Sequence, residues 1–210
     1  MKKHKLFIKD ALSTDIYKDV RCPYDGTLVA SVEQANASTL EQALANAHTS
    51  FHTVMKTMPA WERANILYKV ATLIKNNIGE LAMTIAEEGG KPLKDARVEA
   101  TRAVNTIKMS GDEALQLNGE QITMDRSRGS ENMLAFTLRE PVGPVFGISA
   151  FNHPLNLMAH QIGTALAGGN SVIAKPATTT PLSALKLGQF FLKAGLPEGV
   201  LSIPVATGAD

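Results

Sequence analysis

Three apolar segments in the last third of the chain each end at polar residues that could take part in chemistry. The first ends in "SAFN" at Asn152, the second in "AKPAT" with Lys175 and Thr178, and the third in "VATG" at Gly208. An amide donates to a developing oxyanion, and an ammonium binds hydroxyls or a phosphate. Ligands of open α/β sheets bind beyond the carboxyl ends of the strands. If the three segments are parallel strands, these four residues lie on one rim, which is the expected site.

Asn152 and Lys175 also have purely structural explanations. Asn152 lies just before Pro154, and an asparagine in that place often caps the following helix. Lys175 follows "SVIA", and a lysine at a strand end can simply extend its ammonium into water. Pro176 fixes the direction of the turn, which favours a positioned lysine. The spacing alone leaves both alternatives open.

Motifs for several other chemistries are absent from the sequence. There is no G-x-G-x-x-G fingerprint and no Walker motif, so nucleotide binding is at this point only an analogy with the fold. No H-x-x-E-H or C-x-x-C spacing occurs, and no metal site is expected. No G-x-S-x-G elbow is present. Cys22 stands in a turn-rich stretch and is interpreted as an incidental thiol. Glu87 and Glu88 are adjacent and should point to different sides of a helix, so they are not a catalytic pair.

The elements around the candidate residues alternate between strand and helix. "PVFGISA", "SVIAK" and "GVLSIPV" are predicted strands, and residues 154–169 and 181–195 are predicted helices that begin near Pro154 and Pro181. Strands this apolar are typical of a parallel sheet that is covered on both faces. Residues 141–210 therefore predict the βαβαβ first half of a doubly wound, Rossmann-like domain, which looks cut short at its end.

The preceding residues predict helices and one hairpin. A capping box with Ser38 at the N-cap and Glu41 opens the first helix. A second helix begins near Pro59, a third ends at Gly89-Gly90, and a fourth covers about 92–117. Residues 118–140 contain two extended segments between turn residues, which indicates a β-hairpin that projects from the body. Because an unpaired hairpin edge usually needs a partner, an oligomer is expected.

Composition excludes several classes of partner. Of 210 residues, 21 are Lys or Arg and 20 are Asp or Glu, so the net charge of +1 gives no sign of nucleic-acid or membrane binding. The basic start is followed only by "LFI", too short for a signal peptide, and no segment approaches the length of a membrane span. The single cysteine fits a reducing compartment. We therefore expect a cytoplasmic protein.

Five collinear blocks resemble the N-terminal part of the aldehyde dehydrogenase superfamily. They are "CPYDG" (22–26), "EEGGKPLKDARVEATRA" (87–103), "LREPVGPVFGISAFNHPLN" (138–156), "ALAGGNSVIAKPATTTPLSAL" (165–185) and "AGLPEGVLSIPVATG" (194–208). The resemblance implies an enzyme that oxidises a small polar aldehyde to its acid with NAD(P)⁺. It also implies that residues 1–117 are the helical part of the NAD(P)-binding domain, that 118–140 form an oligomerisation arm, and that 141–210 are half of that domain. Family members are dimers or tetramers.

The resemblance assigns roles to the rim residues. Asn152 matches the family asparagine that donates to the oxyanion, and Lys175 matches the lysine that contacts the adenosine ribose. Ser149, Ala150 and Phe151 match the backbone that runs along the cofactor, and Gly208 matches a glycine near the adenine. NAD-preferring members often carry a glutamate where this chain has Thr178. The resemblance therefore implies that NADP is tolerated and favours NADP over NAD.

The resemblance also bears on the substrate and on what is missing. His153, Asn156 and Leu157 match positions near the substrate tunnel. Gln116 matches the position where members that take anionic aldehydes often have an arginine, which argues against an anionic substrate. The family's nucleophilic cysteine and water-activating glutamate match nothing here, so we expect the 210 residues alone to be inactive. Two interpretations remain, the cofactor-binding portion of an aldehyde dehydrogenase and a stand-alone, non-catalytic nucleotide-binding or interaction module.

Overall fold

The three apolar segments form one parallel sheet, as predicted. The computed structural model describes residues 2–207. Strands β6 (Val145–Ile148), β7 (Val172–Lys175) and β8 (Leu201–Ser202) lie in the order β6-β7-β8, with Ile148 opposite Lys175 in the register. Helix α5 (Pro154–Ala167) joins β6 to β7, and α6 (Leu182–Lys193) joins β7 to β8. The βαβαβ unit is therefore confirmed.

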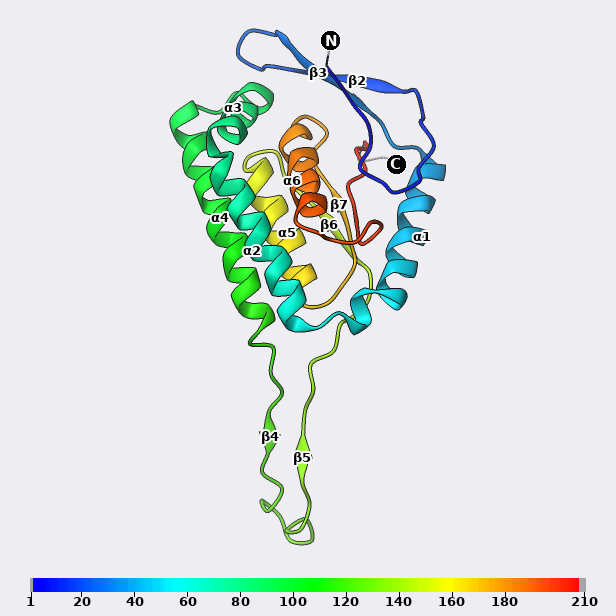
Figure 1. Cartoon of the computed structure of the whole chain (residues 1–210), viewed down its shortest axis with the longest axis vertical. Coiled ribbons are helices and arrows are strands. Elements are labelled where there is room, and N and C mark those ends of the chain that lie inside the picture. The colour runs from blue at the N-terminus through cyan, green and yellow to red at the C-terminus, as the bar shows by residue number, and fades with distance from the viewer. Residues whose placement is uncertain (1, 208–210) are drawn as a thin grey trace.

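Helices cover the two faces of this sheet unequally (Figure 1). On one face α5 and α6 pack on the strands, and α2 (Ala60–Asn76), α3 (Ile78–Gly89) and α4 (Leu93–Ala114) pack against those two helices. On the other face α1 (Ala37–Thr53) contacts β7 and β8, where its Ala43 and Ala47 meet Ile173. A short 3₁₀ helix, η1 (Met55–Thr57), leads from α1 toward α2.

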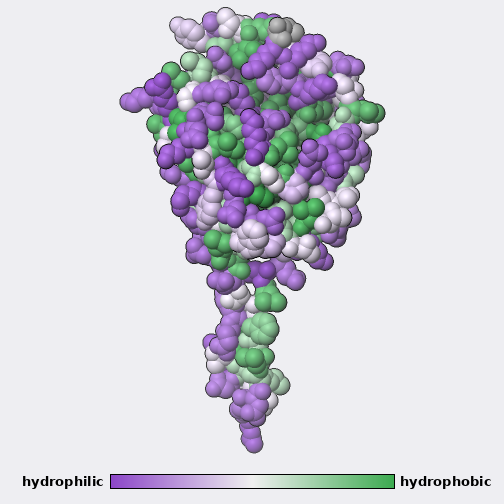
Figure 2. Space-filling view, viewed as in Figure 1, coloured by the Kyte–Doolittle hydropathy of each residue, from purple (hydrophilic) through white to green (hydrophobic). Residues whose placement is uncertain are grey.

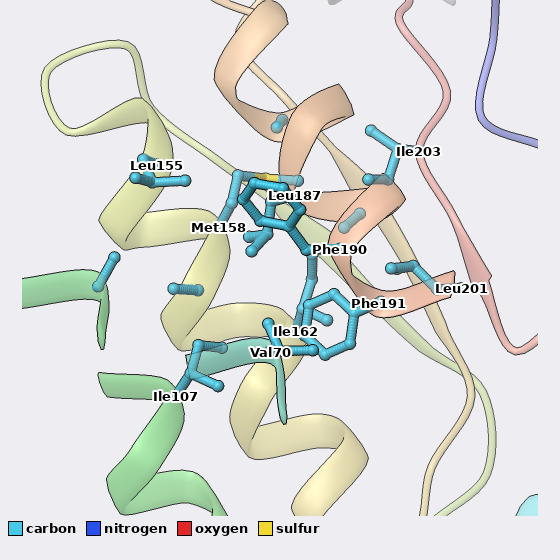
Figure 3. Close-up of a cluster of buried hydrophobic side chains, with 14 of the residues drawn as sticks. Val70, Ile107, Leu155, Met158, Ile162, Leu187, Phe190, Phe191, Leu201 and Ile203 are labelled. Carbon is cyan, nitrogen blue, oxygen red and sulfur yellow. The ribbon is translucent and has the colours of Figure 1, made fainter. Parts of the chain in front are cut away.

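The main core lies between α5, α6 and the strands (Figure 3). Met158 and Ile162 of α5 face Leu187 and Phe191 of α6, and all four side chains are fully buried. Truncation of such side chains to alanine in a close-packed core costs about 2–5 kcal/mol. The core therefore fixes the two helices whose N-termini lie near the candidate rim.

One prediction about the sheet is wrong. Strand β6 was expected to be covered on both faces, but Phe146 is 55% exposed and Ile148 is 65% exposed, whereas Val172, Ile173 and Ala174 of β7 are buried. Within residues 2–207, β6 is an edge strand. An apolar strand sequence does not by itself say whether a second layer covers it.

Most predicted helix ends are confirmed, and one is corrected. Gly90 ends α3 in the left-handed conformation, with φ +66°. The N-cap of α1 is Asn36 and not Ser38: the Asn36 side chain accepts from the Thr39 N–H at 2.9 Å, and the Thr39 hydroxyl accepts from the Asn36 N–H at 2.9 Å. This reciprocal pair uses the same spacing that had been assigned to Ser38 and Glu41.

The N-terminal residues form a second, smaller sheet. Strand β3 (Leu28–Glu33) pairs in parallel with β1 (Lys3–His4) and antiparallel with β2 (Tyr17–Arg21), and a turn at Asp25-Gly26 joins β2 to β3. The connection from β1 to β2 passes beside the large sheet, where the Ile203 N–H donates to the Phe7 carbonyl at 2.7 Å.

The predicted hairpin projects from the body between α4 and β6 (Figure 1). Its pairing is short, with β4 (Gln121–Ile122) antiparallel to β5 (Ala135–Phe136). Apolar side chains lie along the hairpin in Figure 2, and Ile122, Met133, Leu134, Phe136 and Leu138 are each more than two-fifths exposed. Among the described residues, none of the helices is both long and apolar enough to span a bilayer.

Candidate functional site

The three predicted loops meet at the carboxyl edge of the sheet. The Ser149 N–H donates to the Lys175 carbonyl at 2.9 Å, which joins the first loop to the end of the second strand. The Thr178 hydroxyl donates to the Ala206 carbonyl at 3.1 Å, which joins the second loop to the third. Parallel strands with right-handed crossovers bring such loops together. Gly208 lies outside the described residues.

The rim side chains differ in how free they are to bind a ligand. Ser149 is buried, Lys175 and Thr178 are half-buried, and Ala150 and Phe151 are exposed. Within residues 2–207, the one hydrogen-bond partner of the Lys175 ammonium is the adjacent Pro176 carbonyl, at 3.4 Å. A half-buried lysine with a single weak local contact keeps donors available for a hydroxyl or phosphate oxygen. The edge is open enough at Ala150 and Phe151 for a ligand to lie along the backbone.

Asn152 does not cap the following helix. The N-cap of α5 is His153, and no cap side chain bonds to the first turn. Asn152 is exposed and lines an open pocket of about 510 Å³, together with Phe151 and His153 on its own loop. Lys91 and Arg102 also line this pocket. The structural explanation for this asparagine is therefore excluded, and its amide is available to the pocket.

The first turn of α5 is capped instead by a buried glutamate from α4. Glu99 Oε1 accepts the N–H groups of Leu155 at 2.9 Å and Asn156 at 3.2 Å. These are among the N–H groups that a helix leaves without an internal partner. Sequence reasoning missed Glu99 because the distant N–H groups that it caps cannot be read from its position in α4. A signal was present, since Glu99 falls on the same stripe as Ala96 and Ala103, which are buried.

Lys91 connects this glutamate to the loop of Asn152. Its ammonium forms an ion pair with Glu99 Oε2 and donates to the Asn152 carbonyl at 2.5 Å. The same nitrogen lies 3.1 Å from His153 Nδ1. The Lys91 side chain is 17% exposed and that of Glu99 is fully buried. The pocket wall beside Asn152 therefore contains a nearly buried ion pair that no spacing in the sequence indicated.

A second buried glutamate caps α6 in the same manner. Glu88 accepts the Leu182 N–H at 2.6 Å and the Ser183 N–H at 3.1 Å, while Glu87 is exposed. Burial raises the pKa of Glu88 to about 7, against the opposing effect of these hydrogen bonds. The prediction that Glu87 and Glu88 point to different sides is confirmed, and Glu88 has a structural role.

The remaining candidates lie on α5 or beyond α4. Asn156 is half-buried, and its Oδ1 accepts from the Thr106 hydroxyl of α4 at 2.9 Å, while Leu157 is half-buried one residue further on. Neither lines the Asn152 pocket. Gln116 is exposed, follows the end of α4 and is also absent from the pocket lining. Four residues of α4 do line that pocket, and they are Asp95, Val98, Glu99 and Arg102.

Two other chemistries find no support in the part of the chain that the structure describes. No group of three or more His, Cys, Asp or Glu side chains in residues 2–207 could hold a metal ion. Cys22 follows β2 and bonds through its backbone to Thr27, and it does not line the pocket. The described site therefore offers the Asn152 amide, three basic side chains (Lys91, Arg102 and Lys175), two acidic ones (Asp95 and Glu99) and an open rim.

Comparisons with known proteins agree with this arrangement. The sequence model of the aldehyde dehydrogenase family matches residues 11–210. A 3-sulfolactaldehyde dehydrogenase from Priestia aryabhattai is 36% identical over 211 residues, covering 100% of this chain and 44% of that protein. Aspartate-semialdehyde dehydrogenase 1 from Pseudomonas canavaninivorans is 40% identical over 190 residues, covering 90% and 40%.

Solved structures show the same likeness. Aldehyde dehydrogenase 21 from Physcomitrella patens, in complex with the reaction product succinate, superposes with a TM-score of 0.94 at 36% identity, covering 100% of this chain and 44% of that one. An NADP-dependent glyceraldehyde-3-phosphate dehydrogenase from Bacillus halodurans, complexed with NADP, gives 0.89 at 34% identity, covering 93% and 41%. The chain spans less than half the length of the proteins it matches.

Proposed function

Because the chain belongs to the aldehyde dehydrogenase family, we propose that it forms the cofactor-binding portion of an enzyme that oxidises a small polar aldehyde to its acid with NAD(P)⁺. In this proposal residues 1–117 and 141–210 bind the cofactor, and 118–140 form the arm through which subunits associate as a dimer or tetramer. One observation carries the proposal. An open rim with Ser149, Lys175 and Thr178 lies beside a pocket into which Asn152 is free to donate.

The rim residues fit a nicotinamide cofactor. When bound, NAD(P)⁺ supplies a hydride acceptor. The Lys175 ammonium would donate to ribose hydroxyls, and the exposed backbone of Ala150 and Phe151 would run beside the cofactor. The Asn152 amide would donate to the oxygen of the aldehyde as negative charge develops there. Such a preorganised donor contributes about 2.7–4 kcal/mol to transition-state stabilisation.

Thr178 favours tolerance of NADP. Its side chain is neutral, half-buried and engaged with the Ala206 carbonyl. A carboxylate at this position would repel a 2′-phosphate, whereas a hydroxyl would not. Among structural neighbours, one dehydrogenase is complexed with NADP and another protein with nicotinamide adenine dinucleotide. Similarity to the family therefore does not by itself distinguish NADP from NAD as the cofactor. Calorimetric titration with both cofactors tests this preference, and clearly tighter binding of NAD⁺ would contradict it.

Arg102 favours an aldehyde that carries an anionic group. It is exposed, lines the pocket of Asn152 and makes no ion pair within the described residues. A free guanidinium pairs well with a carboxylate, sulfonate or phosphate. Relatives are named for anionic and for cationic aldehydes, the latter including a betaine aldehyde dehydrogenase from Vibrio vulnificus at 38% identity. Asp95 and Glu99 also line this pocket, and Glu99 is paired with Lys91, so the support for an anionic aldehyde comes from Arg102 alone, contrary to what Gln116 had suggested.

One observation favours the second candidate, a non-catalytic nucleotide-binding or interaction module. The chain's single cysteine, Cys22, does not line the pocket of Asn152. An aldehyde dehydrogenase of the family type needs a thiolate there. The two candidates can be distinguished by incubating the natural-length protein with an aldehyde. A thiol that becomes acylated or blocked indicates the dehydrogenase, and the absence of such a thiol indicates the non-catalytic module.

The experiment measures NADPH and NADH formation by the natural-length protein. An aldehyde carrying a carboxylate or sulfonate is compared with a neutral analogue of the same length and with betaine aldehyde. We expect the highest kcat/KM with the anionic aldehyde and activity with NADP⁺. Absence of cofactor reduction with every aldehyde, despite measurable cofactor binding, would favour the non-catalytic module.

A further inference from the structure

The loop that carries Asn152 is held at its two ends by side chains from α5 and from the connection between α3 and α4. At its start, Gln161 of α5 donates from Nε2 to the Ile148 carbonyl at 2.7 Å. At its end, Lys91 donates to the Asn152 carbonyl at 2.5 Å. The Asn152 side chain is exposed and lines the pocket. Since nothing in its own surroundings orients the amide, its direction depends on how the backbone is held.

The surroundings of Lys91 match the donors of an ammonium. A lysine has three N–H donors and no acceptor. The Glu99 carboxylate and the Asn152 carbonyl both accept from its nitrogen, and His153 Nδ1 lies 3.1 Å from the same nitrogen and 3.4 Å from Glu99 Oε2. One cation therefore holds two consecutive residues of the loop.

The two members of the ion pair have separable tasks. Glu99 Oε1 satisfies the first turn of α5 through the N–H groups of Leu155 and Asn156. Glu99 Oε2 pairs with Lys91. The helix start is thus capped without any contribution from the lysine, whose remaining donors act only on the loop. Replacing Lys91 should disturb the loop and leave the start of α5 in place.

We propose that Lys91, held by Glu99, is a positioning residue that sets the direction of the Asn152 amide in the pocket. The inference rests on the proposed role of Asn152 as oxyanion donor. Because donors act only when they point at the position that the oxyanion will occupy, a displacement of about 1 Å can cost about 100-fold in rate. The effect belongs to the chemical step, since the cofactor rim at Lys175 and Thr178 is joined by other bonds.

The test uses the natural-length protein with four substitutions. Lys91→Met removes the donors and keeps a long apolar stem, and Lys91→Arg keeps the charge and should restore part of the function. Lys94→Met is the matched control, because Lys94 is an exposed lysine in the first turn of α4, three residues after Lys91. Loss of one partner leaves a buried charge unpaired. The double variant Lys91→Met with Glu99→Gln therefore removes both charges and retains an acceptor oxygen for α5.

We expect kcat to fall about 10- to 100-fold in Lys91→Met and in the double variant. KM for the cofactor should stay within about twofold, and Lys94→Met should behave as wild type. A merely structural role would lower the amount of folded enzyme without this split between kcat and KM. Equal kcat values for Lys91→Met and Lys94→Met, measured per folded molecule, would overturn the proposal.

Amide hydrogen exchange tests the same inference without activity. Exchange over 149–153 should accelerate at least tenfold in Lys91→Met relative to Lys94→Met, while the Leu155 and Asn156 amides stay protected in the single variant. Unchanged exchange over 149–153 would overturn the proposal. If the wild-type protein oxidises no aldehyde, the proposed function fails, and faster exchange would still support the positioning of the loop by Lys91.

Discussion

Replacement of the buried Glu88 by glutamine should destabilise the protein through the start of α6. Both carboxylate oxygens of Glu88 accept backbone N–H groups, from Leu182 at 2.6 Å and from Ser183 at 3.1 Å. Glutamine has one acceptor oxygen, so its NH₂ group would face one of these donors. A buried N–H left without an acceptor costs about 1–3 kcal/mol. We expect Glu88→Gln to lower the free energy of unfolding by that amount.

The same substitution should change how stability depends on pH. Burial raises the pKa of Glu88 in the folded state to about 7, from a usual value of 4.5. The folded state therefore holds this proton more tightly than the unfolded state. The stabilising contribution of the protonated carboxyl is complete below about pH 4.5 and is lost as the pH rises through about 7. The difference between the two pKa values, converted at 1.36 kcal/mol for each pKa unit, gives this contribution a full size of about 3 kcal/mol.

Urea unfolding followed by circular dichroism measures both effects. The wild-type protein should exceed Glu88→Gln in stability most at about pH 5, and the difference should shrink by about pH 8. Glu87→Gln is the control, because Glu87 is the exposed neighbour on the same helix. Parallel stability curves for wild type and Glu88→Gln across this range would refute the reasoning about burial. A Glu88→Gln protein as stable as wild type at every pH would refute the capping role.

Two further substitutions test the ligand assignments. Thr178→Glu should weaken NADP⁺ binding at least about tenfold through repulsion of the 2′-phosphate, and it should leave NAD⁺ binding unchanged or tighter, as measured by calorimetry. An equal loss of affinity for both cofactors would mean that the 2′-phosphate does not lie beside residue 178. Arg102→Leu should raise KM for an anionic aldehyde about 10- to 100-fold, because a hydrogen bond to a charged group contributes about 1.5–3 kcal/mol, with little change for the neutral analogue. An equal rise in KM for both aldehydes in initial-rate assays would argue against an anion site at Arg102.

The order of the elements could be predicted from the sequence because each rests on a local pattern. The strands β6 to β8, the proline-initiated helices, the Gly90 helix end and the hairpin all follow from spacing within a few residues. The predicted N-cap of α1 was wrong because Asn36 and Ser38 each begin an acceptable capping motif. The reciprocal bonds of Asn36 and Thr39 decide between them.

The pocket wall could not be predicted because its partners are far apart in sequence. Glu99 caps a helix through the Leu155 N–H, which lies 56 positions further along the chain, and Lys91 reaches a carbonyl 61 positions further on. Nothing local marks a glutamate as the cap of another helix. The exposure of Phe146 on β6 was missed for a related reason, because burial of an apolar side chain depends on which elements pack against it.

The central claim is that Asn152 donates to the oxyanion in an NAD(P)⁺-dependent aldehyde oxidation. The most direct measurement is kcat for Asn152→Ala in the natural-length protein at saturating cofactor and aldehyde. Asn105→Ala serves as the control, since Asn105 is exposed on α4 and outside this pocket. We predict that kcat falls about 100- to 1,000-fold in Asn152→Ala while cofactor affinity is unchanged. A kcat equal to that of Asn105→Ala would contradict the claim.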